Sequence, residues 1–528
     1  MDTIIFPIIY AVVLLVFLHA KLKHELHMMQ LSSYMNERYY KWLKKNFFNS
    51  LRLIEYFLIA SFAALFYLEL TQYAFVIISL YVFLSYKSSI KRQKKPLVYT
   101  KRCRRLFAMN TFLMLLPLFA SLIIYDFQIT IESSFILSAT AVSSFAIIGL
   151  ANIFLIPVEL SINRWYYNDA ERILRSMPNL IIIGITGSYG KTSTKHFLHT
   201  ILSEKYNVLM TPGSYNTTMG VIRTVREYLK PTHQVFIVEM GAKHIGDIKK
   251  IADLVRPYHG IITAVGEQHL DTMKTIENVQ KTKFELVDSL PEKGVAILNA
   301  DYEYVIRRTV DNCKTRYYSN DKGDIEYRIG DVSYNRKGTN FSVYQHDEKI
   351  GKFETPMLGE YNLSNILASI MMAKVLNVDL ESISVGIKRL RPVKHRMEVK
   401  QNKNGITIID DAFNSNPMGA KMALDVLKNI EGDRKIIVTP GMVELGDKQI
   451  IYNENFGKQI ATSCDYVILV GNYASKHIKD GMMSEGFDEQ KVHVAKTFFE
   501  ATKHLNSFIK SGDVVLYEND LTDDYENQ

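Results

Sequence analysis

One short run of residues constrains the fold more than any other feature of this sequence: an aliphatic segment, a glycine-rich turn and an amphipathic segment follow directly on one another. The aliphatic segment begins at Leu180, the turn reads Thr186-Gly-Ser-Tyr-Gly-Lys-Thr192, and the amphipathic segment ends at Leu202. This succession is typical of a strand that leads through a turn into a helix, with backbone N–H groups and the helix dipole directed at a phosphate. We therefore predict a nucleotide-binding loop inside an α/β domain.

The chemistry of the turn suits a nucleotide with its metal ion. Lys191 supplies a cation, and Thr192 supplies a hydroxyl for Mg²⁺. The strict phosphate-loop pattern G-x-x-x-x-G-K-[ST] requires glycine where Ile185 stands, so the generic pattern fails by one residue. A chance glycine turn is the alternative, and the flanking strand and helix disfavour it. The predicted nucleotide-binding residues of the turn are Gly187, Ser188, Gly190, Lys191, Thr192 and Ser193.

The first third of the chain is dominated by apolar stretches. About 20 apolar residues are needed to cross the roughly 30 Å of hydrocarbon in a bilayer. We therefore predict about five membrane spans, of which the second and third form a hairpin that is shallow or re-entrant. Buried helices of a soluble core are the alternative. The stretches are residues 4–20, 53–70, 73–86, 106–125 and 134–157.

Charge is distributed very unevenly between this region and the rest of the chain. Residues 1–163 contain 16 Lys and Arg against 8 Asp and Glu, whereas residues 164–528 are balanced at 47 each. The two basic loops, 21–52 and 87–105, are predicted to be cytoplasmic, which puts the N-terminus outside and all that follows the spans inside. We therefore expect a multi-pass protein of the cytoplasmic membrane with membrane lipid as a partner. The balanced remainder argues against nucleic acid as a partner.

Further segments after the glycine turn resemble, in order, the motifs of the Mur ligase family. The matches cover about residues 179–450 and are most similar to the branch that adds D-Ala-D-Ala to muramyl peptides. The family joins amino acids or peptides to a carboxylate with ATP, through an acyl phosphate. The segments are Ser214-Tyr-Asn-Thr-Thr-Met-Gly220, Val235-Phe-Ile-Val-Glu-Met-Gly-Ala242, Thr263-Ala-Val-Gly-Glu-Gln-His-Leu-Asp271, Gly359-Glu-Tyr-Asn-Leu-Ser-Asn-Ile366, His395-Arg-Met-Glu398 and Asp410-Asp-Ala-Phe-Asn-Ser-Asn-Pro417.

Metal binding is predicted at three residues besides Thr192. Glu239, at the carboxyl end of a strand, can reach the Mg²⁺ on Thr192, with a buried salt bridge as the alternative. His269 can ligate a second metal ion through neutral imidazole, with a capping or core histidine as the alternative. The resemblance implies that Lys283 is carbamylated and binds the second Mg²⁺, whereas the residues alone indicate a solvated helix lysine.

The resemblance also implies residues for the nucleotide and the substrates. Asn362 and Asn365 would lie on the adenine side, Arg396 would hold phosphate, and Asp410 or Asp411 would hold the ribose. The predicted catalytic residues are Lys191, His269, Lys283 and Arg396, and the predicted substrate residues are Asn216, Thr217, Asn414 and Asn416.

These patterns predict four parts of the chain. Residues 1–160 form a multi-span α-helical membrane region, and residues 161–178 form an interfacial linker helix. Residues 179–391 form a P-loop-type central ATPase domain, and residues 392–528 form a C-terminal α/β domain with a doubly wound, Rossmann-like sheet. The stretch Arg391-Pro-Val393 is the predicted hinge, whose closure assembles a site from both domains.

The chain departs from the family at both ends. A membrane region stands where soluble relatives bind the UDP end of the substrate, and the acidic Glu518–Asp524 stands where relatives are basic. We therefore predict an ATP-dependent, ADP-forming amide ligase that adds an amino acid or dipeptide to a nucleotide-activated or lipid-linked envelope precursor. The alternatives are a poly-γ-glutamate or folylpolyglutamate-like ligase, and an ATP-driven membrane transporter or sensor. ADP release that depends on both an amine and a carboxylate separates the ligases from the transporter and the sensor.

Overall fold

The computed structural model falls into two compact units, Met1–Trp165 and Tyr166–Gln528. It describes residues 19, 21–45, 96–124, 140, 143–320, 322–335, 338–401, 404–412, 417–443, 445–472 and 474–519.

The first unit is helical in its described residues. Its elements are α2 (Asn36–Lys45), α5 (Lys101–Ile124) and the first part of α7 (Ser144–Arg175). Tyr39 is fully buried between them and donates a hydrogen bond to the carboxylate of Glu25 at 2.5 Å. Arg105 on α5 forms a bidentate ion pair with Glu159 on α7, at 2.7 and 2.8 Å. Polar pairs therefore join these helices alongside a small apolar core.

The prediction of a multi-pass membrane protein is wrong. Among the described residues, one helix, Ser144–Arg175, is long and apolar enough to cross a membrane, and it qualifies by length and composition only. Hydropathy counts apolar side chains without showing their surroundings: Leu106 and Ile148 lie in the common core of the first unit, whereas Phe112 and Ile153 of the same helices are exposed. The predicted stretches 4–20, 53–70 and 73–86 lie almost wholly outside the described residues.

The second unit begins with a sheet of nine strands in the order β2-β3-β1-β4-β5-β6-β7-β8-β9. Neighbouring strands from β2 to β7 are parallel, and β7, β8 and β9 form an antiparallel extension. The strands are β1 (Ile181–Thr186), β2 (Val208–Met210), β3 (Val235–Glu239), β4 (His259–Ile262), β5 (Val295–Asn299), β6 (Lys314–Ser319), β7 (Tyr327–Asn335), β8 (Gly338–Gln345) and β9 (Glu348–Thr355).

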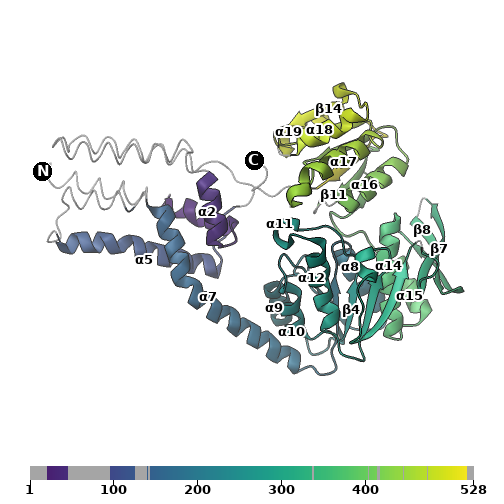
Figure 1. Ribbon diagram of the computed structural model, residues 1–528, viewed down its shortest axis with the longest axis horizontal. Coiled ribbons are helices and arrows are strands. Elements are labelled where there is room, and N and C mark those ends of the chain that lie inside the picture. Colours follow the sequence, from purple (N-terminus) through teal and green to yellow (C-terminus); the bar gives the residue numbers. More distant parts are fainter. Residues whose placement is uncertain are drawn as a thin grey trace. The chain divides into compact units, whose positions relative to one another are not determined.

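Helices cover both faces of this sheet (Figure 1). Ile183 and Ile185 of β1 pack with α8, α14 and α15 on one face, and Ile182 packs with α9, α10 and α12 on the other. This alternation follows from the two-residue period of a strand. The helices are α8 (Lys191–Leu202), α9 (Thr218–Glu227), α10 (Asp247–Val255), α11 (Leu270–Met273), α12 (Ile276–Asp288), α13 (Glu303–Ile306), α14 (Glu360–Val375) and α15 (Leu380–Lys388).

A second sheet follows, with six strands in the order β10-β11-β15-β12-β13-β14. Only the β10–β11 pair is antiparallel, and apolar cores lie on both faces of the sheet. Its elements are β10 (Glu398–Gln401), β11 (Thr407–Asp411), α16 (Pro417–Asn429), β12 (Lys435–Thr439), η2 (Gly446–Lys448), α17 (Gln449–Ala461), β13 (Tyr466–Val470), α18 (Ser475–Ser484), η3 (Glu489–Lys491), β14 (Val492–Ala495), α19 (Phe498–Phe508) and β15 (Val514–Glu518).

Both predicted α/β domains are present, with the doubly wound sheet in the second. The antiparallel strands β7 to β9 were not anticipated. Glu518, the first residue of the acidic segment Glu518–Asp524, ends β15 and is buried, where it accepts a hydrogen bond from Thr439 at 3.0 Å. The exact domain limits remain predictions.

Two glycines let α17 and α18 approach each other closely. A Cβ added at Gly457 would overlap the carbonyl oxygen of Ile478, and one added at Gly481 would overlap that of Glu454. We predict that Gly457→Ala destabilises the chain by about 1–3 kcal/mol, because backbone atoms have to move apart. Thermal unfolding measures this. Gly323→Ala is the control, because nothing surrounds that position within 4 Å. Equal melting temperatures for both variants would contradict the prediction.

Candidate active site

The glycine turn has the geometry of a phosphate-binding loop. It connects β1 to α8, and Gly190 precedes the helix with φ 81°, a left-handed conformation that favours glycine. A Cβ at Gly190 would also overlap the side chain of Asn365. The ammonium of Lys191 donates hydrogen bonds to the loop carbonyls of Gly187 at 2.6 Å and Ser188 at 3.3 Å. The lysine therefore lies along the loop, at the N-terminus of the helix, where an anion is stabilised.

A second segment, residues 263–267, supports the loop from the next strand of the sheet. The Ser188 hydroxyl donates to the carbonyl of Gly266 at 2.8 Å and accepts from its N–H at 3.0 Å. Thr263 donates to the carbonyl of Tyr189. The conformation of the phosphate-binding loop is therefore fixed by residues that follow β4, about 75 positions further along the chain.

Glu239 is the centre of the polar contacts beside the loop. It ends β3, is 1% exposed, and accepts hydrogen bonds at Oε1 from Thr192 at 3.0 Å and from Asn216 at 3.1 Å. Lys195 Nζ forms an ion pair with Oε2 at 3.0 Å. Burial by itself would raise the pKa of Glu239, but the charges of Lys195 and Lys191 lower it overall. The carboxylate is therefore ionised at neutral pH.

This arrangement fits a magnesium ion. The buried Oε2 of Glu239 is engaged by the Lys195 ammonium at 3.0 Å, and because a carboxylate oxygen has two lone pairs, one is left for a metal ion. One carboxylate, the Thr192 hydroxyl, phosphate oxygens and waters form a ligand set that Mg²⁺ takes. No group of three His, Cys, Asp or Glu side chains with metal-binding geometry occurs in the described part of the chain. A Mg²⁺ here would therefore take its protein ligands from Glu239 and Thr192 and its remaining ligands from phosphate oxygens and waters.

Lys195 was missed by the sequence reasoning. It is fully buried one helical turn after Lys191, and its ammonium also donates to the carbonyl of Gly213 at 2.5 Å. The available signal was the spacing, because positions i and i+4 of a helix lie on the same face. A second lysine four residues after the phosphate-loop lysine points to the same site.

Lys283 on α12 lies in the opposite environment from the expected solvated lysine. It is 2% exposed. Burial is the largest cause that lowers its pKa well below the usual range, and the nearby charge of Lys191 adds to this, while Glu285 and Asp247 act against it. A buried amine of low pKa is partly neutral, and neutral lysine is nucleophilic.

His269 has an unusual backbone conformation. It precedes α11 with φ 53°, in the left-handed region that is uncommon for a residue other than glycine. Its backbone carbonyl accepts from the N–H groups of Thr272 and Met273 at 3.1 and 3.0 Å. Strained backbone of this kind occurs at functional sites. No described contact joins its ring to Glu239, so its metal role remains a prediction.

The two asparagines predicted on the adenine side differ in their contacts. Asn365 on α14 is 2% exposed and accepts from Thr194 at 3.0 Å, but its amide nitrogen has no partner within the described residues. This buried donor can serve a bound nucleotide. Asn362 instead donates to the carbonyl of Leu358 at 2.8 Å, in the local turn before the helix.

The C-terminal domain brings charged residues towards the loop. The charge of Arg396 acts on the pKa of Lys191. Burial raises the pKa of Asp411 to about 6, against the N–H of Met397 and the charge of Arg396. Asp410 pairs with His395 at 2.8 Å. Of the two aspartates, Asp411 is the one that accepts a hydrogen bond from the N–H of Met397, at 3.1 Å.

The predicted substrate residues have different places. Asn216 contacts Glu239, as described above. Thr217 caps α9 by accepting from the N–H of Gly220 at 3.3 Å, which is a structural role. Asn414 and Asn416 lie outside the described residues. The described structure thus places Asn216 at Glu239, and the substrate roles of all four residues remain predictions.

One contact between the domains was not anticipated. Glu267, in the segment that supports the phosphate-binding loop, pairs with Lys448 at 2.6 Å and accepts a hydrogen bond from Tyr452 on α17. Its backbone carbonyl accepts from Tyr189 at 3.0 Å. Sequence patterns could not find this contact, because Lys448 and Tyr452 follow Glu267 by 181 and 185 positions in the chain.

Comparison with protein families gives two matches. The Mur ligase middle domain matches residues 185–373, and the Mur ligase, glutamate ligase domain matches residues 395–517.

Comparison with individual proteins gives relatives that include several named UDP-N-acetylmuramoyl-tripeptide--D-alanyl-D-alanine ligase. The protein of Bacillus subtilis (strain 168) is 29% identical over 341 residues, which cover 64% of this chain and 72% of that one. The protein of Mycobacterium tuberculosis (strain ATCC 25618 / H37Rv) is 30% identical over 360 residues, which cover 64% and 70%. These matches give no support to the multi-pass membrane location, which the helices had already contradicted.

Solved structures give the same result. MurF from Acinetobacter baumannii has a TM-score of 0.61 at 25% identity, over 67% of this chain and 76% of that one. The MurF ligase from Thermotoga maritima in complex with ADP has a TM-score of 0.60 at 24% identity, over 67% and 80%, and its likeness is one of fold.

The ion pair of Lys195 yields a test of the site. We predict that Lys195→Gln raises the pKa of Glu239, because the lysine charge is what holds that pKa down. Protonated Glu239 cannot bind Mg²⁺, so the acidic limb of the pH–rate profile moves to higher pH and more Mg²⁺ is needed for half-maximal activity. Breaking a buried pair also costs about 3–5 kcal/mol of stability. Lys195→Arg keeps the charge and should restore the profile. Lys205→Met, on an exposed lysine just beyond α8, is the control. An unchanged acidic limb in Lys195→Gln would contradict the prediction.

Proposed function

The chain belongs to the Mur ligase family, and from this premise we propose that it adds D-alanyl-D-alanine to the peptide carboxylate of UDP-N-acetylmuramoyl-tripeptide. It is an ATP-dependent, ADP-forming ligase, as members of the family are. The proposed substrates are those in the names of its relatives, a nucleotide-activated muramoyl peptide and a dipeptide. Membership of a ligase family sets aside an ATP-driven transporter or sensor.

The observation that carries the proposal is the ionised Glu239 beside Thr192 and Lys191. This trio lies at the carboxyl end of parallel strands, where ligands bind in open α/β sheets. It brings together a phosphate-binding loop, a carboxylate suited to a metal ion and a cation: Thr192 donates to Glu239 at 3.0 Å, and the charge of Lys191 lowers the pKa of Glu239. A nucleotide-sensing protein would need the loop, but it would not need a cationic residue from the next domain, Arg396, near the same loop.

The first step transfers the terminal phosphoryl group of ATP to an oxygen of the acceptor carboxylate. The P–O bond to ADP breaks, and the acyl phosphate and ADP are formed. Lys191 lowers the repulsion between the two anions and stabilises the charge that spreads over the transferred group. Backbone N–H groups at the start of α8 act on the same oxygens. Magnesium, when bound at Glu239 and Thr192, neutralises phosphate charge.

The second step forms the amide bond. The amine of the incoming dipeptide attacks the acyl carbon, the C–O bond to phosphate breaks, and the amine loses a proton. Arg396 is proposed to hold the departing phosphate from the C-terminal domain. Because Lys191 and Arg396 come from different domains, closure of the two domains sets the geometry of the reaction.

Lys283 is proposed to be carbamylated. The neutral amine of a lysine whose pKa is strongly lowered attacks CO₂, loses a proton and becomes a carbamate, which is an anionic oxygen ligand. Conversion to an anion would also relieve the unfavourable burial of a cation near Lys191. The product would be suited to a second Mg²⁺, together with His269.

A poly-γ-glutamate or folylpolyglutamate-like activity is the second candidate, because it shares the ATP chemistry and differs only in acceptor and amino acid. A lipid-linked precursor is a further possible acceptor. Product analysis by mass spectrometry with each acceptor in turn separates these candidates.

We predict that the purified chain releases ADP continuously only when Mg²⁺, a carboxylate acceptor and an amine are all present, because without the amine the reaction stops at the acyl phosphate. The measurement couples ADP release to a fluorescent or absorbance signal, with UDP-N-acetylmuramoyl-tripeptide and D-alanyl-D-alanine as substrates. Glu239→Gln removes the charged metal ligand and should lower kcat by about 100-fold or more. Lys205→Met serves as the matched control. ATP hydrolysis at the full rate without an acceptor would contradict the proposal.

Carbamylation of Lys283 predicts a dependence on CO₂. Removal of CO₂ and bicarbonate should lower the activity of the native chain, and added bicarbonate should restore it. Lys283→Ala should be inactive and insensitive to bicarbonate, and a small carboxylate such as acetate should restore part of its activity by filling the vacated space. Lys281→Ala, on an exposed lysine of the same helix, should behave like the native chain. Full activity of the native chain without CO₂ would show that the lysine acts unmodified.

A further inference from the structure

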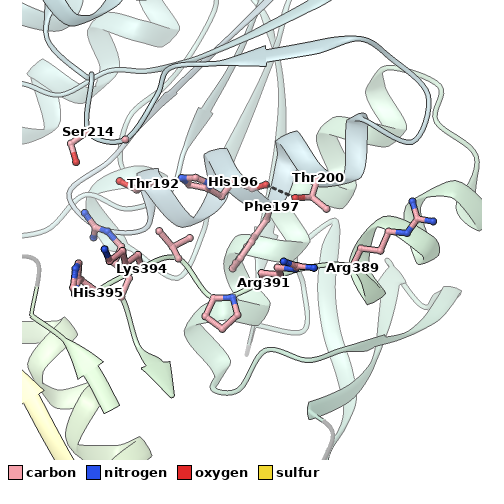
Figure 2. Close-up of a pocket in the computed structure, with 13 residues that line it drawn as sticks. Thr192, His196, Phe197, Thr200, Ser214, Arg389, Arg391, Lys394 and His395 are labelled. Atoms are coloured by element: carbon pink, nitrogen blue, oxygen red, sulfur yellow. Dashed lines mark hydrogen bonds between the residues drawn. The ribbon is translucent and has the colours of Figure 1, made fainter. Parts of the chain in front are cut away.

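A cavity of about 550 Å³ lies beside α8 and extends from Thr192, a hydrogen-bond partner of Glu239. Its walls are one face of α8, the loop after β2 at Gly213 and Ser214, and the linker between α15 and β10. Figure 2 shows Lys394 and His395 near the Thr192 end of the helix, and Arg391 and Arg389 towards its Thr200 end. The cavity therefore begins at the predicted metal site and runs along the helix.

The walls of the cavity are strongly basic. Arg389, Arg391, Lys394 and Arg396 line it together with two histidines, and no Asp or Glu does. Glu204 pairs with Arg389 at 2.8 Å. Arg391 and Lys394 are exposed, and no ion pair within the described residues engages them. A concave surface that carries charge of one sign concentrates the electric field and attracts ligands of the opposite sign.

The cavity is separate from the predicted adenine side of the nucleotide. Thr194 of α8 hydrogen-bonds Asn365 on α14, whereas His196 of α8 lines the cavity. Residues that are two positions apart in an α-helix point in directions that differ by about 200° around the helix axis. Thr194 and His196 therefore point to opposite sides of α8. An adenine beside Asn365 would leave the cavity free for another ligand.

The length of the cavity determines the distance between the charged groups of a ligand that contacts both of its ends. Thr192 and Thr200 both line it and are eight residues apart, which is about 12 Å of helix at 1.5 Å per residue. A carboxylate that reacts beside Thr192 would thus place a group about 12 Å away next to Arg391 and Arg389. Guanidinium groups form paired hydrogen bonds with carboxylates and phosphates, which makes them selective for such groups.

We propose that this cavity is an anion-binding subsite for the acceptor, in which Arg391 holds a second carboxylate or a phosphate about 12 Å from the carboxylate that reacts. The inference rests on the proposed function, because it assumes that the acceptor carboxylate reacts near Thr192. It adds a requirement on the substrate: an acceptor without a second anionic group binds weakly.

Steady-state kinetics of the full chain test the subsite. Arg391→Gln removes the charge and keeps a polar side chain of similar length. It should raise KM for UDP-N-acetylmuramoyl-tripeptide about tenfold or more, the effect of losing a charged hydrogen bond, with kcat and the KM for ATP within about twofold. Lys388→Gln, on an exposed lysine that ends α15 outside the cavity, should leave all three values unchanged. An unchanged KM for the acceptor in Arg391→Gln, or a rise confined to the KM for ATP, would overturn the inference.

A binding measurement separates failure of the subsite from failure of the proposed function. Calorimetry with the phosphate-binding loop saturated by ADP and Mg²⁺ uses inorganic pyrophosphate in one arm and tricarballylate in the other. Binding of pyrophosphate alone assigns a phosphate to the subsite, and binding of tricarballylate assigns a carboxylate. Either should weaken at least tenfold in Arg391→Gln and persist in Lys388→Gln. If neither probe binds, or if binding is equal in the two variants, the subsite does not exist, whatever reaction the chain catalyses.

Discussion

The buried carboxylate of Glu239 is the interaction on which the rest of the site depends. A charge with 1% exposure is stable only because Thr192, Asn216 and Lys195 surround it, two of them from α8 and Asn216 from the loop before α9. The strand order β3-β1-β4 places the end of β3 directly beside the phosphate-binding loop that follows β1. The sheet thereby brings three distant parts of the sequence together, so that one buried carboxylate is surrounded by cationic and hydrogen-bond-donating side chains.

Cations outnumber anions around this point. The charge of Glu239 acts on both Lys191 and Lys195, and Lys283 is close enough for the charge of Lys191 to act on it. The pKa of each of the three lysines is lowered, with burial as the largest cause. Such a site carries excess positive charge, which bound anions would neutralise. ATP, an acceptor carboxylate and a carbamate each supply negative charge. The site is therefore built for substrates that repel one another in water.

Sequence reasoning reached the parts of the site that are local in the chain and missed the parts that are not. The turn at Thr186–Thr192 combines strand, glycine and helix signals within a few residues, and the end of β3 follows from one aliphatic run. Lys195 was overlooked because a buried lysine looks like any helix lysine until its partner is known. The prediction of a multi-pass membrane protein rested on hydropathy, which reports the apolar character of a residue and not its surroundings; among the described residues, one helix, Ser144–Arg175, is long and apolar enough to cross a membrane.

The contact of Glu267 has a consequence for how the two domains respond to ligands. The segment 263–267 accepts a hydrogen bond from Ser188 of the phosphate-binding loop. Its Glu267 also forms an ion pair with Lys448 and accepts a hydrogen bond from Tyr452 of the C-terminal domain. Any ligand that shifts this segment in the loop changes the free energy of the contact, and the reverse holds to the same extent, because coupling between two equilibria is reciprocal. Binding energy gained in the loop is thus available to close the domains, and a partner that separated the domains would weaken nucleotide binding by an equal factor.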